Sequence, residues 1–247
     1  MFKSKDQIIY GYHPVLEAVQ RNVSIDKVLF AKNLSRSKYE EIMYLCRQKN
    51  IPVQFVPKEK LAKITNLNHQ GIIALNALID YADIEQIIPF IYEQGKTPLI
   101  LVLDGVTDVR NFGSIARSAE CAGVDAIIIS LRGSAQINSE AIKASAGALN
   151  KIPVCRVDSM VSTVQYLKEA GLAIFAISEK GDKAYFEEDF DKPLAMIMGD
   201  EENGIGDDLL HLADDALLIP MKGQIQSLNV SVAAGIILFE ILKKQTR

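Results

Sequence analysis

The chain has 247 residues, 49% of them apolar, with 27 basic residues against 31 acidic ones. This length is sufficient for one large domain or two small ones. No apolar run reaches 18 residues and the N-terminal segment lacks an apolar core, so we expect neither a membrane span nor a secretory signal but a cytoplasmic protein.

The three cysteines, Cys46, Cys121 and Cys155, lie far apart and form no CxxC pair. This usage is typical of a reducing compartment and argues against a disulfide framework and against a zinc site. We therefore expect no metal.

The charge is unevenly distributed. Through Leu75 the chain has 12 basic and 6 acidic residues, a net charge of +6, and the remainder has a net charge of −10. A basic module joined to an acidic one indicates that the first binds a polyanion, with RNA the natural candidate. Ordinary surface charge is the alternative interpretation.

Residues 1–77 are predicted to form a small α/β domain, because apolar periodicities of strands and of amphipathic helices alternate. The predicted elements are a helix at Pro14–Gln20, a strand at Lys27–Ala31, a helix at Arg36–Lys49, a strand at Val53–Val56, a helix opened by Pro57 and a strand at Gly71–Ala77. Residues 78–94 are predicted to be a linker, about Leu78 to Asp83, and a leading helix, Ile84–Glu93.

Residues 95–247 are predicted to form a second α/β domain, in which near-continuous apolar strands indicate a parallel sheet covered on both faces. The predicted strands are Leu99–Leu103, Asp125–Ile129, Ile152–Val157, Leu172–Ile177, Leu194–Met198 and Ala216–Ile219. The carboxyl ends of such strands carry the functional site.

The first segment of interest at these ends runs from Asp104 into a helix that carries Asn111 and Arg117. A bend between loop and helix would let both side chains turn toward one cavity. Arg117 then supplies a fixed cation near a phosphate or a reacting hydroxyl. The alternative is a structural arginine paired with an acid.

The second segment, Met198–Gly206, places glycines around Asp200, Glu201 and Glu202. It lacks both GxGxxG and GK[ST], and its acids would repel phosphate. The loop therefore suits a neutral or cationic ligand with hydroxyls, unless it is simply an acidic turn before a helix near Asp207–Leu212.

The third segment, Ile219–Gly235, leads from a strand into a run that is apolar almost all the way round. This run predicts a buried helix with Ser227 or Asn229 near its N-cap. Uncharged polar residues gather before it, and they are Gln224, Gln226, Ser227, Asn229 and Ser231. They favour a ligand site over a capped core helix alone.

Three stretches, NFGSIARSAECAG, MIMGDEENGIG and IPMKGQIQSLNVSVAAGIILFE, resemble in order and spacing the three motifs of the SpoU (TrmH-type) RNA ribose 2′-O-methyltransferases of the SPOUT superfamily. YGYHPVLEAV and HQGIIAL resemble the start and end of that family's small RNA-binding domain. The resemblance runs almost end to end and is strongest to the bacterial branch that methylates a guanosine ribose in 23S rRNA.

The resemblance implies a parallel α/β catalytic domain whose C-terminal segment is threaded as a trefoil knot, a feature otherwise nearly absent from proteins. It also implies homodimers packed through the catalytic domain and S-adenosylmethionine bound largely by backbone groups. By motif position the cofactor-binding residues are Gly199, Ile219 and Leu228, with Met221 and Leu131 nearby. Glu202 departs from a glycine frequent in the family.

Methyl transfer to a ribose hydroxyl needs alignment and a proton acceptor. The resemblance assigns Asn111 and Asn229 to positioning the ribose and its phosphate, Arg117 to polarising or deprotonating the hydroxyl, and Glu201 and Ser227 to orienting these groups. The identity of the base stays open, because an ordinary arginine is a poor base.

Other classes of function are a non-catalytic RNA-binding protein, a nucleotide-dependent enzyme on a Rossmann-type sheet, and a methyltransferase acting on tRNA. The first strand of the second domain is not followed by the glycine fingerprint of the Rossmann type.

Overall fold

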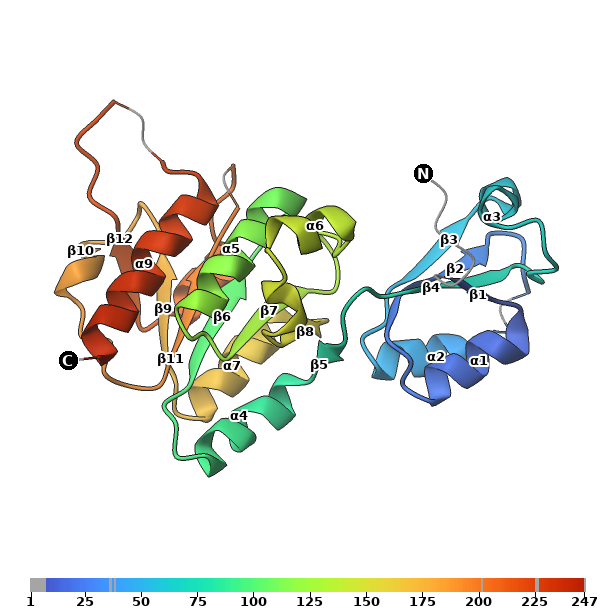
Figure 1. Ribbon diagram of the computed structural model, residues 1–247, viewed down its shortest axis with the longest axis horizontal. Coiled ribbons are helices and arrows are strands. Elements are labelled where there is room, and N and C mark those ends of the chain that lie inside the picture. The colour runs from blue at the N-terminus through green and yellow to red at the C-terminus, as the bar shows by residue number, and fades with distance from the viewer. Residues whose placement is uncertain (1–7, 36, 38, 201, 225–226, 247) are drawn as a thin grey trace. The chain divides into compact units, whose positions relative to one another are not determined.

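The computed structural model describes residues 8–35, 37, 39–200, 202–224 and 227–246. The chain divides into two compact units, Met1–Asp80 and Tyr81–Arg247 (Figure 1). None of the helices in the described ranges is long and apolar enough to cross a membrane.

The first unit is a four-stranded sheet with helices on both faces. Its elements are β1 (Ile8–Tyr10), α1 (Tyr12–Gln20), β2 (Ile25–Ala31), α2 (Glu40–Gln48), β3 (Val53–Val56), α3 (Lys58–Ile64) and β4 (Ile72–Asn76). The strand order is β1-β4-β2-β3, in which β4 is antiparallel to both neighbours and β2 pairs with β3 in parallel. Helices α1 and α2 form a core with one face, and Leu61 of α3 packs on the other.

The second unit is an eight-stranded parallel sheet covered by helices. Its elements are β5 (Tyr81–Ala82), α4 (Ile84–Glu93), β6 (Leu99–Leu103), α5 (Val109–Cys121), β7 (Ala126–Ser130), α6 (Ser139–Ala144), η3 (Ala148–Asn150), β8 (Val154–Val157), α7 (Met160–Glu169), β9 (Ala173–Ile177), β10 (Lys183–Ala184), η4 (Tyr185–Glu187), β11 (Leu194–Met198), α8 (Asp207–Leu212), β12 (Asp215–Leu218) and α9 (Val230–Gln245). The strand order is β10-β12-β9-β11-β6-β7-β8-β5.

The central strands end at one level. Leu103 lies opposite Met198, Met198 opposite Ile177, and Ile177 opposite Leu217. The loops that follow β6, β9, β11 and β12 therefore emerge side by side at the carboxyl edge of the sheet.

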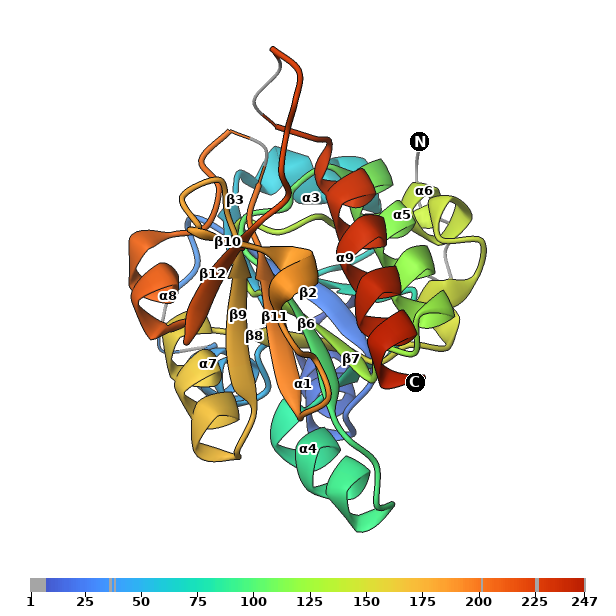
Figure 2. The same cartoon turned by 90° about the vertical axis from the view of Figure 1, so that its left-hand side faces the viewer.

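Each face of this sheet is covered by its own set of helices. Residues of α4, α7 and α8 share one buried core with the sheet. Helices α5 and α9 lie side by side on the opposite face (Figures 1 and 2). The predicted α/β architecture is confirmed, whereas strand order alone does not define a knot, so the trefoil knot stays a prediction.

The boundary between the two units falls within the segment expected to be a linker, in which Tyr81 and Ala82 pair with β8 and form the edge strand β5. One prediction about an individual element is wrong. Helix α9 is not buried all round, because the side chains of Val232 and Phe239 are each 50% exposed. These two residues are seven apart and so lie on one face of the helix.

Candidate functional site

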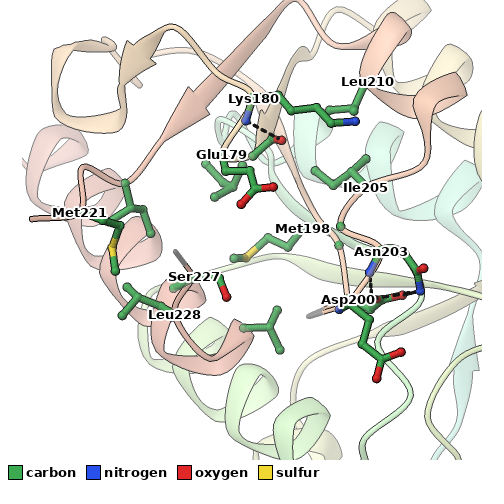
Figure 3. A pocket seen from close by; sticks show the side chains of 18 residues that line it. Glu179, Lys180, Met198, Asp200, Asn203, Ile205, Leu210, Met221, Ser227 and Leu228 are labelled. Carbon is green, nitrogen blue, oxygen red and sulfur yellow. Dashed lines mark hydrogen bonds between the residues drawn. The ribbon is translucent and has the colours of Figure 1, made fainter. Parts of the chain in front are cut away.

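A cavity of about 370 Å³ opens at the carboxyl edge of β9, β11 and β12 (Figure 3). Segments far apart in the sequence form its walls. The lining residues are Ile177, Ser178, Glu179, Lys180, Met198, Gly199, Asp200, Glu202, Asn203, Gly204, Ile205, Leu210, Ile219, Met221, Ser227, Leu228, Val230 and Ala233. The second and third segments of interest from the sequence thus meet around one space.

Four of the five predicted cofactor-binding residues line this cavity. They are Gly199, Ile219, Met221 and Leu228. The fifth, Leu131, follows β7, which β6 separates from β11, and it is not among the described lining residues. Its backbone N–H donates instead to the carbonyl of Val157, 2.8 Å away. The structure therefore does not bring Leu131 to the cavity.

Gly199 occupies a position where only glycine fits. A Cβ atom at this residue would lie 2.1 Å from the carbonyl carbon and oxygen of Gly204, which are backbone atoms. Asp200 and Gly204 form an antiparallel bridge that folds the loop back on itself. The close approach of two backbone segments gives the cavity a wall of peptide groups at the end of β11.

Asp200 holds this loop together. Its Oδ1 accepts hydrogen bonds from the backbone N–H groups of Glu202, at 2.7 Å, and Asn203, at 2.6 Å, and the Asn203 side-chain amide donates to Oδ2 at 3.1 Å. The bond from the Asn203 backbone is the main cause of the lowered pKa of the Asp200 carboxyl, because such bonds favour the ionised form. Asp200 is thus a structural anion at the wall of the cavity.

The role of this loop was predicted to fall on Glu201, and that of Asp200 was not predicted. Glu201 lies outside the described residues. The sequence did contain a signal for Asp200, because an aspartate in a polar, glycine-containing loop commonly forms an Asx turn. In such a turn its side chain accepts a hydrogen bond from a backbone N–H group two residues farther along. A second anchor was also missed, since Asp104 after β6 accepts from the Gly206 N–H at 2.9 Å and fixes the far end of the loop.

The cavity has an acidic rim and an apolar floor. Its charged lining residues are Glu179, Lys180, Asp200 and Glu202, three anions and one cation. The ammonium of Lys180 lies 3.4 Å from Asp207 outside the cavity, which leaves the rim negative. Figure 3 shows Glu179 and Asp200 on opposite sides of Met198, with Met221 and Leu228 on a third side. Such a cavity favours a ligand that is cationic and partly apolar.

Asn111 and Asn229 form a pair beside the cavity. The Asn229 side-chain Nδ2 donates to the Asn111 Oδ1 at 3.1 Å. Asn229 is also the N-cap of α9, where its Oδ1 accepts from the Ser231 N–H at 3.0 Å. Asn111 lies in the first turn of α5, capped by Asp108. The structure therefore brings together two of the predicted catalytic residues, and the expected cap at Asn229 is confirmed.

Arg117 lies apart from this pair. The Asp108 cap places Asn111 inside α5, so the bend expected between Asn111 and Arg117 is absent. Six residues in an α-helix turn the side chain by about 120°, so the two residues share no face. Arg117 is exposed and has no hydrogen bond or ion pair with any described residue, so the structural arginine paired with an acid is not observed either.

The remaining predicted residue, Ser227, lines the cavity one residue before Leu228. It connects the cavity to the Asn111–Asn229 pair, since Asn229 lies two residues farther along the chain. Across the described ranges, no cluster of three His, Cys, Asp or Glu side chains could hold a metal ion. The cavity and the asparagine pair supply amides, a hydroxyl, carboxylates, the Lys180 ammonium and backbone groups.

Comparison with known proteins shows that both units of the chain match known families. Residues 98–239 match the SpoU rRNA methylase family, and residues 8–81 match the RNA 2′-O ribose methyltransferase substrate-binding domain. A Staphylococcus saprophyticus protein assigned to the TrmH family of tRNA/rRNA methyltransferases is 35% identical over 96% of each chain.

Solved structures agree. An AdoMet-bound rRNA methyltransferase from Sinorhizobium meliloti matches with a TM-score of 0.61 and 25% identity over 96% of this chain and 87% of that one. A TrmH/SpoU tRNA-modifying enzyme from A. aeolicus matches with a TM-score of 0.56 and 29% identity over 66% of this chain and 84% of that one. The chain belongs to the SpoU family of RNA 2′-O-ribose methyltransferases.

Proposed function

We propose that this protein transfers the methyl group of S-adenosylmethionine to the ribose 2′-hydroxyl of a guanosine in 23S rRNA. The observation that carries the proposal is the juxtaposition of an acidic, partly apolar cavity with the Asn111–Asn229 pair at the carboxyl edge of the sheet. The family match supplies the reaction class, and the geometry indicates where the two substrates would lie.

The cavity suits S-adenosylmethionine in charge and shape. A sulfonium cation is compatible with the rim formed by Glu179, Asp200 and Glu202. Apolar side chains such as Met198 and Leu228 offer surface for an adenine, and the backbone around Gly199 offers hydrogen-bonding groups to its edge. When bound, this cofactor supplies an electrophilic methyl group.

The chain's own residues then act on the ribose. Asn111 and Asn229 orient the ribose and its phosphate, because each is already held by a helix N-terminus and by the other. Such preorganisation lowers the barrier by fixing the geometry of attack. Ser227 and Glu201 orient these groups, and Arg117 stabilises the developing charge on the hydroxyl oxygen as a permanent cation.

We also propose a homodimer through the catalytic unit. Val232 and Phe239 form a half-exposed apolar stripe on α9, and the exposed Arg117 lies on the neighbouring helix α5. A second copy packed on this face would cover the stripe. It would also place Arg117 at an interface. Its guanidinium could there act on the site of the partner protomer instead of the site that contains Asn111 of its own protomer.

Ribosomal RNA is favoured over tRNA by the extent of the matches. The S. meliloti rRNA methyltransferase aligns with 96% of the chain, so that alignment includes both units. The A. aeolicus tRNA-modifying enzyme aligns with only 66% of the chain. The basic first unit, with a net charge of +6 through Leu75, would bind structured RNA. We also propose a cytoplasmic location, which is compatible with this substrate.

The test compares acceptors taken from a strain that lacks the protein. Purified 23S rRNA and total tRNA are each incubated with the enzyme and methyl-labelled S-adenosylmethionine, and the labelled ribose is mapped. We expect label at a guanosine of 23S rRNA and background counts in tRNA. Label confined to tRNA would overturn the rRNA assignment, and the absence of cofactor binding in calorimetry would favour a non-catalytic RNA-binding protein.

A further inference from the structure

The first unit contains a cavity of its own, with a volume of about 640 Å³. The loops after β2 and before β4, with the start of α3, form its walls. The lining residues are Ala31, Lys32, Asn33, Leu34, Pro57, Lys58, Glu59, Leu67, Asn68, His69, Gln70 and Gly71. This volume lies within the range of small-ligand sites, about 300–1,000 Å³.

His69 is the polar group that points to a ligand. Its side chain is only 9% exposed, and Nδ1 accepts a hydrogen bond from the Gly71 N–H at 3.0 Å. Burial, together with the charge of Lys58, lowers the pKa of the imidazole, so the ring is neutral and carries its proton on Nε2. No hydrogen bond joins that N–H to a described residue, and Nε2 is not one of the buried side-chain atoms without a partner, so the N–H is accessible to solvent. A ligand in the cavity can accept a hydrogen bond from it in place of water.

The loop that carries His69 is fixed before any ligand binds. Gln70 has a φ of 52°, a conformation uncommon for residues other than glycine. It is held there because Tyr39 Oη donates to the Gln70 carbonyl at 2.6 Å and the Tyr12 N–H donates to its side-chain oxygen at 3.1 Å. Strain of this kind, held by surrounding contacts, clusters at ligand clamps.

The composition of the walls selects the ligand. Lys32 and Lys58 outweigh the single acid, Glu59, and suit a phosphodiester. The side-chain amide of Asn33 and the His69 Nε2–H supply groups that can read a base edge. Leu67, 45% exposed, offers an apolar surface against a base. RNA is recognised in this way where a base is unpaired and splayed out of a helix.

We propose that this cavity binds one unpaired nucleotide of the RNA substrate, with the base held by His69 and Asn33 and the phosphate by Lys32 and Lys58. The inference rests on the proposed function, because that function makes RNA the substrate. It goes further by assigning a recognition site to the first unit, separate from the reacting ribose.

The test measures binding by the full-length protein without S-adenosylmethionine. The probes are an RNA hairpin with one bulged 2-aminopurine nucleotide and the same hairpin with that nucleotide paired. We expect the bulged hairpin to bind about tenfold more tightly, with a change in 2-aminopurine fluorescence. One well-formed hydrogen bond and the burial of a base are together sufficient for such a factor.

Matched variants locate the site. His69→Ala and Asn33→Ala should each bring the two hairpins to within about threefold of each other, while Lys58→Ala should weaken both and flatten the salt dependence by about 0.7–0.9 log units. Lys60→Ala changes the same charge on the same helix outside the cavity, so the preference for the bulge should persist. Asn33 is exposed, so its variant folds even if His69→Ala does not.

Equal binding of the two hairpins by the wild-type protein would overturn the inference, as would an undiminished preference in both folded variants. These outcomes are independent of catalysis. A protein that methylates rRNA but shows no preference for the bulge refutes this inference and leaves the proposed function standing. A preference for the bulge without methyl transfer supports this inference and contradicts the proposed function.

Discussion

The side-chain amide of Asn229 donates a hydrogen bond to the side-chain oxygen of Asn111, 118 residues earlier in the chain, across 3.1 Å. Each residue sits at the N-terminal end of a helix on the same face of the sheet. The pair therefore links the first and third motifs of the family and joins the N-terminal ends of α5 and α9 at the edge where the cavity opens.

Asn229 has two roles that substitution can separate. Asn229→Ala removes both the cap of α9 and the bond to Asn111, so we expect strongly reduced methyl transfer and a loss of about 0.5–2 kcal/mol in the free energy of unfolding. Asn229→Asp keeps the capping oxygen for the Ser231 N–H but has no amide to donate to Asn111. Its stability should stay near that of the wild type while its activity falls. Wild-type activity in the Asp variant would show that donation from residue 229 to Asn111 is not needed.

Arg117 should matter for turnover and not for cofactor binding. Arg117→Ala should remove most of kcat while leaving the Kd for S-adenosylmethionine within a few fold, because Arg117 does not line the cavity. Arg110→Ala is the control, since Arg110 is an exposed arginine of the same helix whose ion pair with Glu140 contributes little. Parallel loss of cofactor affinity and activity in Arg117→Ala, measured by calorimetry and single-turnover kinetics, would contradict this assignment.

The wall of the cavity should be sensitive to a single methyl group. Gly199→Ala would place Cβ 2.1 Å from the backbone of Gly204, so the loop that Asp200 organises must move. We expect cofactor binding to fall at least tenfold in calorimetry. Gly223→Ala is the matched control, because a Cβ there meets nothing within 4 Å. Equal affinities of the two variants would show that the cofactor does not contact this wall.

The buried imidazole of His69 should make the stability of the first unit depend on pH. Its pKa is lowered in the folded protein by burial and then by Lys58, so the unfolded chain binds the proton more readily. Stability present at pH 7.5 should therefore be lost as the pH falls below about 6.5, the ordinary value for histidine. Urea unfolding gives the free energy of unfolding of the wild type and of His69→Gln, and the difference between the two should narrow as the pH falls. A difference that stays constant with pH would mean that the pKa of His69 is not lowered in the folded protein.

The sequence was most informative where one interaction dominates. Strands β6 and β11 were predicted to the residue, because short continuous apolar runs bounded by turn residues are typical of buried strands in a parallel sheet. The rule that ligands bind at carboxyl ends predicted where the loops would meet, whereas the choice of Gly199, Ile219 and Leu228 came from the resemblance to the family's motifs. These features depend on local pattern and on the direction of the chain.

The errors have both local and long-range causes. The position of Arg117 depended on where α5 begins, and the Asp108 cap moved that start ahead of Asn111. The open face of α9 could not be distinguished from a buried one, because an apolar residue carries the same signal in a core and on a protein interface. The cavity around His69 requires two loops and the start of α3, whose proximity only the folded sheet reveals.

The most direct test of the account is the identity of the methylated atom. RNA from a strain lacking the protein is incubated with the purified enzyme and S-adenosylmethionine, digested to nucleosides and analysed by mass spectrometry. We predict a new nucleoside, methylated on the ribose 2′-oxygen, that depends on the cofactor and is reduced with Asn229→Asp. A methyl group found on a base, or an unchanged nucleoside profile with folded, cofactor-bound enzyme and both RNA classes present, would contradict the account.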